Sequence, residues 1–268
     1  MNLAIRSTTS FVLIGLLLVV VLGLPPIWLG LLCFAFTAMG LYEFFTLMKG
    51  AGTPVYRLFG VSMGLIVSVA VFLGEGITRS GEVLFLVLGC LCLFVIQFLR
   101  KDKGDALIGI ALTLFGILYV SWFLSFVLKI RFLDGGERWV TYLLTVTKST
   151  DVGAYFVGSL FGRHPLIPEV SPKKSVEGLF GGLFAAAAVS LVFRSYLPFL
   201  FGIPHLLVLG ILLGAIGQIG DLSESLMKRF CKTKDSGRFF PGMGGALDLI
   251  DSILFTAPIF YFHLKIFV

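Results

Sequence analysis

Charged residues are scarce in this chain: Asp, Glu, Lys and Arg make up 13% of its 268 residues, against about 25% in a typical soluble domain. Cysteine occurs four times. Cys33, Cys90 and Cys92 lie inside apolar runs and Cys231 stands alone in a basic loop, which excludes a disulfide framework. There are only three histidines and none lies among the acidic residues, so the sequence gives no sign of a histidine base.

Apolar residues are correspondingly abundant, at 57% of the chain with a mean hydropathy of +1.01. Most of the apolar runs approach the roughly 20 residues that a spanning helix needs. The sequence therefore predicts an all-α, polytopic integral membrane protein with about nine transmembrane helices. The predicted segments are 11–24, 26–48, 58–74, 83–99, 106–128, 139–162, 178–201, 205–227 and 245–264.

The distribution of basic residues predicts the orientation of these helices. With the N-terminus in the cytoplasm, 14 of the 21 Lys and Arg residues fall on the inner side, six on the outer side, and Lys148 within a segment. This asymmetry follows the positive-inside rule. The long basic loops 163–177 and 228–244 are then cytoplasmic. Nucleic acid is not an expected partner, because there is no basic domain or aromatic platform outside the membrane.

Polar residues divide the chain into two predicted regions. Residues 1–138 are expected to form a transmembrane scaffold of about five helices, and residues 139–268 a polar catalytic region that contains both basic loops. A carboxylate at the centre of a spanning helix costs about 2.5–3.5 kcal/mol. The acids of the second region therefore need counter-ions, metal or water.

The spacing of these acids is helical. Asp221, Glu224 and Lys228 follow at i, i+3 and i+7 and share one helix face. Asp248 and Asp251 share the first turns of the last helix, after a glycine-rich turn at 242–245 whose N–H groups could bind a phosphate. Carboxylates beside a phosphate need a cation between them, and Mg²⁺ is the natural choice.

These residues resemble the signature of the phosphatidate cytidylyltransferases, or CDP-diacylglycerol synthases. The resemblance covers roughly residues 151–252. Its matching residues near the last two helices are Ser225, Lys228, Arg229, Lys234, Asp235, Gly237, Phe240, Pro241, Gly244, Gly245, Asp248 and Asp251. Its upstream part is Asp151, Tyr155, Gly158, Phe161, Gly162, Arg163, His164, Pro168, Ser171, Lys173, Lys174, Glu177 and Gly178.

The resemblance implies transfer of CMP from CTP to phosphatidic acid, in a multi-pass protein of a bacterial-type inner membrane with its active site facing the cytoplasm. It also implies Mg²⁺, a second cation for which K⁺ is a candidate, contact with membrane lipids and a homodimer. The implied catalytic residues are Asp221, Asp248, Asp251, Lys228 and Arg229, of which the three aspartates bind metal. The implied substrate-binding residues are Ser171, Lys173, Lys174, Glu177, Ser225, Lys234, Asp235, Arg238, Gly244 and Gly245.

Some positions depart from the family pattern. Met243 stands where the family has His, and Leu249 where it has Arg. Structural alternatives also remain: Glu43 is expected to be an interfacial residue, and Lys148 with Asp151 a buried i, i+3 pair. The rival functions are a related CTP-dependent lipid kinase, a membrane transporter and an inactive homologue.

Overall fold

A computed structural model describes residues 15–74, 80–99, 104–199 and 201–268, with the backbone alone for residues 80–83. Arg6, Arg79, Arg100, Lys101 and Lys103, which enter the predicted charge asymmetry, lie outside the described residues, as does the first part of the 11–24 segment.

Helices account for most of the described chain, which confirms the all-α prediction. They are η1 (Val19–Gly23), α2 (Pro26–Gly50), α3 (Arg57–Leu73), α4 (Ser80–Leu99), α5 (Ala106–Gly116), η2 (Ile117–Trp122), α6 (Phe123–Arg131), α7 (Gly136–Phe161), α8 (Val176–Val192), η3 (Phe193–Ser195), α9 (Ile203–Phe230) and α10 (Ala246–Phe267). The segments α5, η2 and α6 follow one another without a break and form one continuous helix, Ala106–Arg131.

Five helices of the described residues are long and apolar enough to cross a membrane: Pro26–Gly50, Ala106–Arg131, Val176–Ser195, Ile203–Phe230 and Ala246–Phe267. Two more apolar helices, Arg57–Leu73 and Leu84–Leu99, are shorter. Helix α7 is also long enough to cross a membrane. It is more polar than these helices, because Lys148 and Asp151 lie in the middle of its sequence. The chain is thus a helical protein with several potential membrane spans, and the larger count of about nine stays a prediction.

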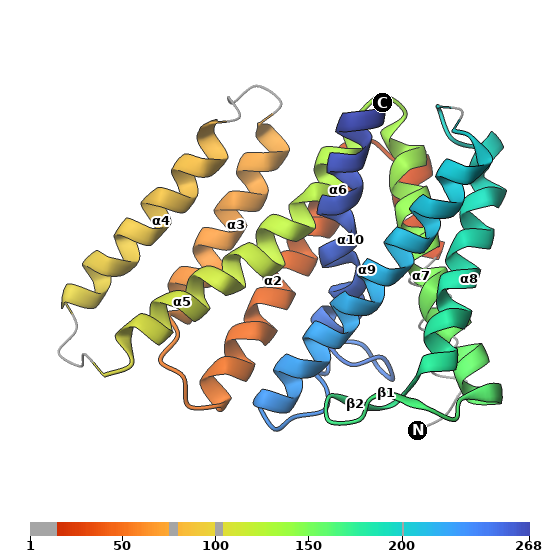
Figure 1. Ribbon diagram of the computed structural model, residues 1–268. Coiled ribbons are helices and arrows are strands. Elements are labelled where there is room, and N and C mark those ends of the chain that lie inside the picture. Colours follow the sequence, from red (N-terminus) through yellow and green to blue (C-terminus); the bar gives the residue numbers. More distant parts are fainter. Residues whose placement is uncertain (1–14, 75–79, 100–103, 200) are drawn as a thin grey trace.

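The polar loops gather at one end of the molecule (Figure 1). The loop after α7 folds into a short antiparallel hairpin of β1 (Pro165–Ile167) and β2 (Ser171–Ser175). This hairpin lies at the same end as the last turn of α9 and the first turn of α10, whereas the C-terminus lies at the opposite end. The fold therefore brings the two predicted basic loops together.

The C-terminal helices pack closely because small residues line their contacts. A Cβ added at Gly182 would come within 2.8 Å of the Thr150 carbonyl oxygen, and one at Gly210 within 2.8 Å of the Ala186 carbonyl oxygen. Helix α10 runs through the middle of this group and packs against α2, α6, α7 and α9. Large side chains such as Trp139, Tyr142 and Phe260 fill the core behind the polar end.

Candidate functional site

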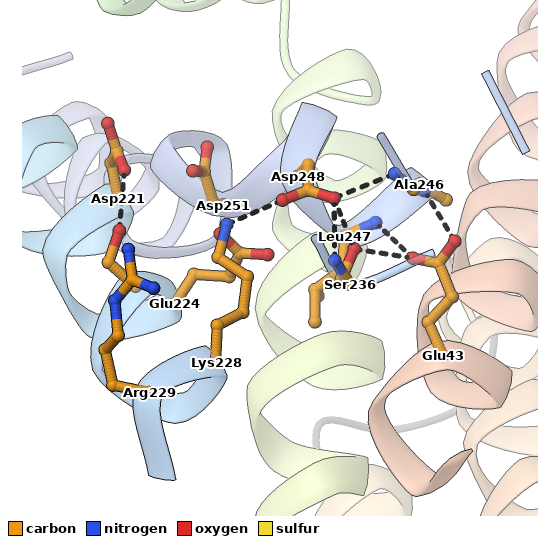
Figure 2. A network of polar contacts seen from close by, with 12 residues as sticks. Glu43, Asp221, Glu224, Lys228, Arg229, Ser236, Ala246, Leu247, Asp248 and Asp251 are labelled. Carbon is orange, nitrogen blue, oxygen red and sulfur yellow. Dashed lines mark hydrogen bonds and ion pairs between the residues drawn. The ribbon is translucent and has the colours of Figure 1, made fainter. Parts of the chain in front are cut away.

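One face of α9 carries the centre of the polar network. Asp221, Glu224 and Lys228 lie on it as their spacing predicts, and Lys228 points toward Asp248 in the first turn of α10 (Figure 2). Glu224 is almost completely buried, at 1% exposure, and Lys228 is largely buried. A buried charge needs partners of opposite sign, because water cannot solvate it there. The partners come from the neighbouring elements.

Lys228 joins α9 to α10. Its Nζ donates to Asp248 Oδ1 at 2.6 Å and contacts Glu224 Oε2 in its own helix (Figure 2). The ammonium group therefore lies between two carboxylates that come from different helices. Removing one member of a buried ion pair typically costs about 3–5 kcal/mol, because the other charge is left unpaired.

Asp248 uses its second oxygen to organise the loop before α10. Oδ2 accepts hydrogen bonds from Ser236 N at 3.0 Å, Ser236 Oγ at 2.7 Å and Gly245 N at 2.8 Å. Gly245 is the N-cap of α10, so this carboxylate caps its own helix while it holds the loop. Both oxygens of Asp248 are thus engaged by protein donors.

Glu43 of α2 completes this arrangement, and the expectation of an interfacial residue is wrong. The side chain is 2% exposed. Its carboxylate accepts from Ala246 N at 3.0 Å, Leu247 N at 2.9 Å and Ser236 Oγ at 3.1 Å (Figure 2). The N–H groups at the start of a helix have no partner within the helix and attract an anion. No local sequence pattern shows that at α10 this anion is Glu43, about 200 residues earlier in the chain.

Protein carboxylates also reach the backbone N–H groups at the predicted phosphate cradle of the glycine turn. The N–H groups of Gly245, Ala246 and Leu247 already donate to Asp248 and Glu43. A ligand phosphate would have to displace a buried carboxylate to reach them. Gly244 has φ +94°, a conformation that glycine adopts without strain, and its carbonyl accepts from Phe240 N. Gly244 therefore shapes the turn, and the N–H of Gly245 donates to Asp248.

Asp221 faces the other side of the site, toward the hairpin. Its Oδ2 pairs with Lys174 Nζ of β2 at 2.7 Å, and its Oδ1 accepts from Ser225 Oγ at 3.4 Å. Both groups border a cavity of about 410 Å³ between α7, the hairpin, α8 and α9. Its polar lining is Asp151, Ser159, Lys173, Lys174, Ser175, Gln218 and Asp221, and its apolar lining includes Ala154, Tyr155, Leu166 and Leu179.

Lys148 and Asp151 form the expected i, i+3 pair, at 3.3 Å. Lys148 Nζ also donates to Ser252 Oγ of α10 at 2.9 Å, so the pair joins α7 to α10. Asp251, which precedes Ser252 in the chain, is buried at 6% exposure. Its Oδ1 accepts a hydrogen bond from the backbone N–H of Ser252. Asp151 therefore both pairs with Lys148 and lines the cavity.

Comparison with known proteins gives this geometry its context. The model of the cytidylyltransferase family matches residues 4–267. The chain belongs to that family.

Relatives of known name support the assignment. The chain is 34% identical over 260 residues to the phosphatidate cytidylyltransferase of Bacillus subtilis (strain 168), covering 95% of this chain and 94% of that one. It is 35% identical over 263 residues to the phosphatidate cytidylyltransferase of Brucella suis biovar 1 (strain 1330), covering 92% and 91%. With the phosphatidate cytidylyltransferase of Staphylococcus saprophyticus it shares 40% identity over 175 residues, which is 65% of this chain and 64% of that one.

The acids of the site bear on whether the chain can hold a cation. Among the residues that the structure describes, no group of three His, Cys, Asp or Glu side chains forms a ready-made metal site. Glu224 Oε1 is nevertheless a buried oxygen that accepts no hydrogen bond from the described residues. Like charges also repel one another between Asp251, Asp221 and Asp151. Oxygen ligands of this kind are those that a hard cation prefers, but the described acids do not form a preassembled ligand set. Asp248 fits less well, because its two oxygens already hold four donors.

Other predicted residues serve the hairpin. Arg229 Nε donates to Val170 O at 3.1 Å and ties α9 to it. Glu177 Oε2 accepts from the backbone N–H of Arg163 at 3.1 Å and of His164 at 3.3 Å, and its Oε1 meets His164 Nδ1 at 2.5 Å. These contacts close the hairpin across its base. Arg229 and Glu177 therefore hold the hairpin that carries Lys173 and Lys174.

The remaining predicted residues lie around the network. Lys234, Asp235 and Arg238 are exposed on the loop before α10, and Lys173 is exposed at the cavity. Ser171, half-buried, begins β2.

Of the two departures from the family pattern, Leu249 packs against the core, and the backbone N–H of Met243 donates to Phe240 O in the turn before α10. Cys231 is buried behind α9, and burial raises the pKa of its thiol, in keeping with a small hydrophobe.

Proposed function

We propose that this chain is a phosphatidate cytidylyltransferase, which transfers CMP from CTP to phosphatidic acid and releases pyrophosphate. Membership of the family and the names of its relatives support this activity. The observation that carries it is the juxtaposition of Lys174 with Asp221 at the cavity and of Lys228 with Glu224 and Asp248 behind it. This places cations and hard oxygen ligands side by side, which two phosphate-bearing substrates require.

The reaction needs charge neutralisation more than proton transfer. A phosphate oxygen of phosphatidic acid attacks the α-phosphorus of CTP, a new P–O bond forms, and the bond between the α- and β-phosphates breaks. The electron pair of that bond leaves with pyrophosphate. A phosphate monoester has a second pKa of about 6 and is already largely a dianion at neutral pH. Positioning and electrostatic stabilisation then dominate, as in other phosphoryl transfers.

The basic residues divide by position. Lys173 and Lys174 border the cavity directly and are suited to bind substrate phosphates. Lys228 lies deeper, where Glu224 and Asp248 hold it in one orientation. The exposed Lys234 and Arg238 can attract an anionic nucleotide or lipid headgroup toward the opening. Lipid chains would lie against the apolar side of the cavity, formed in part by Tyr155, Leu166 and Leu179.

Asp221, Glu224 and Asp251 would hold Mg²⁺, with K⁺ as the candidate second cation. When bound, such a cation neutralises phosphate charge and stabilises the leaving pyrophosphate. Without it, the protein's own contribution is to hold the acids close together and to pair Asp221 with Lys174. Asp248 contributes by fixing Lys228 and the loop.

The setting that we propose is a bacterial inner membrane crossed about nine times, with the hairpin and the 231–245 loop in the cytoplasm and two chains in a homodimer. The shared location of these loops at one end of the molecule supports a single cytoplasmic face (Figure 1). Cytoplasmic CTP and the headgroup of membrane-embedded phosphatidic acid can both reach that face.

Radiolabelled CTP tests the reaction. Purified protein in detergent micelles with phosphatidic acid and Mg²⁺ should move the label of α-labelled CTP, and not that of γ-labelled CTP, into the lipid. Transfer of the γ-label would instead identify a CTP-dependent lipid kinase. Transfer of neither label would contradict both and would leave a transporter or an inactive homologue.

A further inference from the structure

Glu43 is the one acidic residue of the described part of α2, and the reaction proposed above does not use it. It is 2% exposed, in a helix that is otherwise apolar around it. Its carboxylate accepts three hydrogen bonds, two from the backbone at the start of α10 and one from Ser236. Burying a carboxylate without partners costs free energy. A buried glutamate whose carboxylate is fully hydrogen-bonded therefore has a role beyond packing.

The loop before α10 leaves space for this carboxylate. A Cβ added at Gly237 or at Gly245 would collide with the Glu43 side chain. Aromatic contacts fix the same loop to the same helix, since Phe240 stacks on Phe36 with centroids 5.9 Å apart. Phe239 meets Tyr42 edge-on at 6.4 Å. Helix α2 therefore holds the 231–245 loop at a polar point and at two apolar points.

A continuous chain of contacts leads from Glu43 to Lys228. The Ser236 hydroxyl lies 3.1 Å from Glu43 Oε2 and 2.7 Å from Asp248 Oδ2, so its single proton is shared between two carboxylates. Asp248 Oδ1 in turn accepts from Lys228 Nζ at 2.6 Å. Figure 2 shows these groups in one line, from Glu43 through Ser236 and Asp248 to Lys228.

We propose that Glu43 is a positioning residue for cytidylyl transfer: it fixes the start of α10, and with it the orientation of Asp248 and Lys228 beside the acids of α9. The role rests on the proposed function, and it assigns part of the active-site architecture to the N-terminal half of the chain. Glu43 touches no reacting atom and acts through Ser236 and the α10 backbone.

The negative charge of Glu43 is what the position requires. A glutamine has the same shape, but its amide group would direct N–H donors at the backbone N–H groups of Ala246 or Leu247, or at Ser236. At least one donor would lose its acceptor in a buried place. The favourable interaction of an anion with the start of a helix would also be lost.

The test compares Glu43→Gln with Glu137→Gln. Glu137 is a partly exposed residue that pairs with Arg131 at the other end of α7 from the site, so it provides a matched control. In lipid nanodiscs, hydrogen exchange at Ala246 and Leu247 should be about 10-fold faster in Glu43→Gln and unchanged in the control. With α-labelled CTP, Glu43→Gln should lower kcat by about 10-fold and raise the Mg²⁺ concentration for half-maximal activity by a similar factor. A role in folding alone would reduce the amount of active enzyme and leave its Mg²⁺ dependence unchanged.

Ser236→Ala keeps Glu43 but cuts its link to Asp248. It should shift the Mg²⁺ dependence in the same direction while Ala246 and Leu247 stay protected, with Ser125→Ala, whose hydroxyl bonds only within its own helix, as the control. Parental Mg²⁺ dependence in both site variants, or parental exchange in Glu43→Gln, would overturn the proposal. If the unmodified protein transferred no α-label, the proposed function would fail instead, and exchange would still decide whether Glu43 holds the loop.

Discussion

Individual carboxylates in this site have different neighbours and therefore different tasks. Asp221 has one strong partner, Lys174, and borders the cavity. Asp248 accepts from Lys228, Ser236 and Gly245 and is turned toward the protein. The spacing along the sequence treats the two aspartates alike, because both stand on a helix near a basic loop. Their hydrogen bonds separate a ligand-facing acid from one that organises the structure.

Asparagine substitutions should reveal this difference. Asp221→Asn keeps the shape and removes the charge, so it should abolish Mg²⁺-dependent transfer, by about 10²–10³-fold in rate, with the melting temperature nearly unchanged. Asp248→Asn leaves Lys228 and its loop donors with a poorer partner and should lower both the rate and the melting temperature. The rate is measured with α-labelled CTP and the melting temperature by thermal unfolding in detergent.

Asp134→Asn, at an exposed loop position remote from the site, is the matched control. Equal loss of stability in both site variants would contradict the division of roles, and near-normal activity of Asp221→Asn would leave that residue a structural ion-pair partner of Lys174.

At the scale of whole elements, the contact between α9 and α10 sets the position of the acids. Gly220 lies one residue before Asp221, and a Cβ added to it would come within 2.6 Å of the Asp251 carbonyl oxygen and 3.1 Å of Ser252 Cα. The neighbours are backbone atoms, which cannot move aside as a flexible side chain can. Glycine here therefore decides how closely the two acidic helices approach.

Gly220→Ala should separate α9 from α10 and disorganise the site. Overpacking of this kind typically costs about 1–3 kcal/mol, and the rate of lipid labelling should fall because Asp221 and Asp251 move apart. Gly50→Ala is the control, since a Cβ at Gly50 meets nothing within 4 Å. Thermal unfolding and the labelling assay check the two effects. A Gly220→Ala protein with parental stability and rate would show that the helices accommodate the extra methyl group.

At the scale of the whole molecule, the loops of the candidate site gather at one end of the helices. The hairpin and the loop before α10 share one end of the molecule and the C-terminus occupies the other (Figure 1). His205 and His263, whose Nε2 atoms are 3.0 Å apart, lie toward that other end, near the start of α9 and the end of α10. The candidate site therefore occupies one end of the molecule.

Thiol labelling should find the two ends on opposite sides of the membrane. In a chain whose native cysteines are replaced by alanine, Thr233→Cys should react with a membrane-impermeant maleimide only after the cells are opened. Val268→Cys should react in intact cells, because the positive-inside rule places the basic end in the cytoplasm. Labelling of Thr233→Cys from outside would reverse the predicted orientation.

The sequence by itself determined the helical fold, the helix face shared by Asp221, Glu224 and Lys228, and the family, because hydropathy, helical spacing and a long motif are all local properties of the chain. Only the tertiary structure decided which partner each charge has. Glu43 bonds to the start of α10, which lies about 200 residues later in the chain. Lys174 of the hairpin pairs with Asp221 of α9. A buried charge takes the nearest opposite partner or free donor in space, and distance along the chain does not specify that choice. The first N–H groups of α10 show the same rule, since those of Ala246 and Leu247 donate to a carboxylate from a distant helix, and the phosphate cradle expected at the glycine turn stays a prediction.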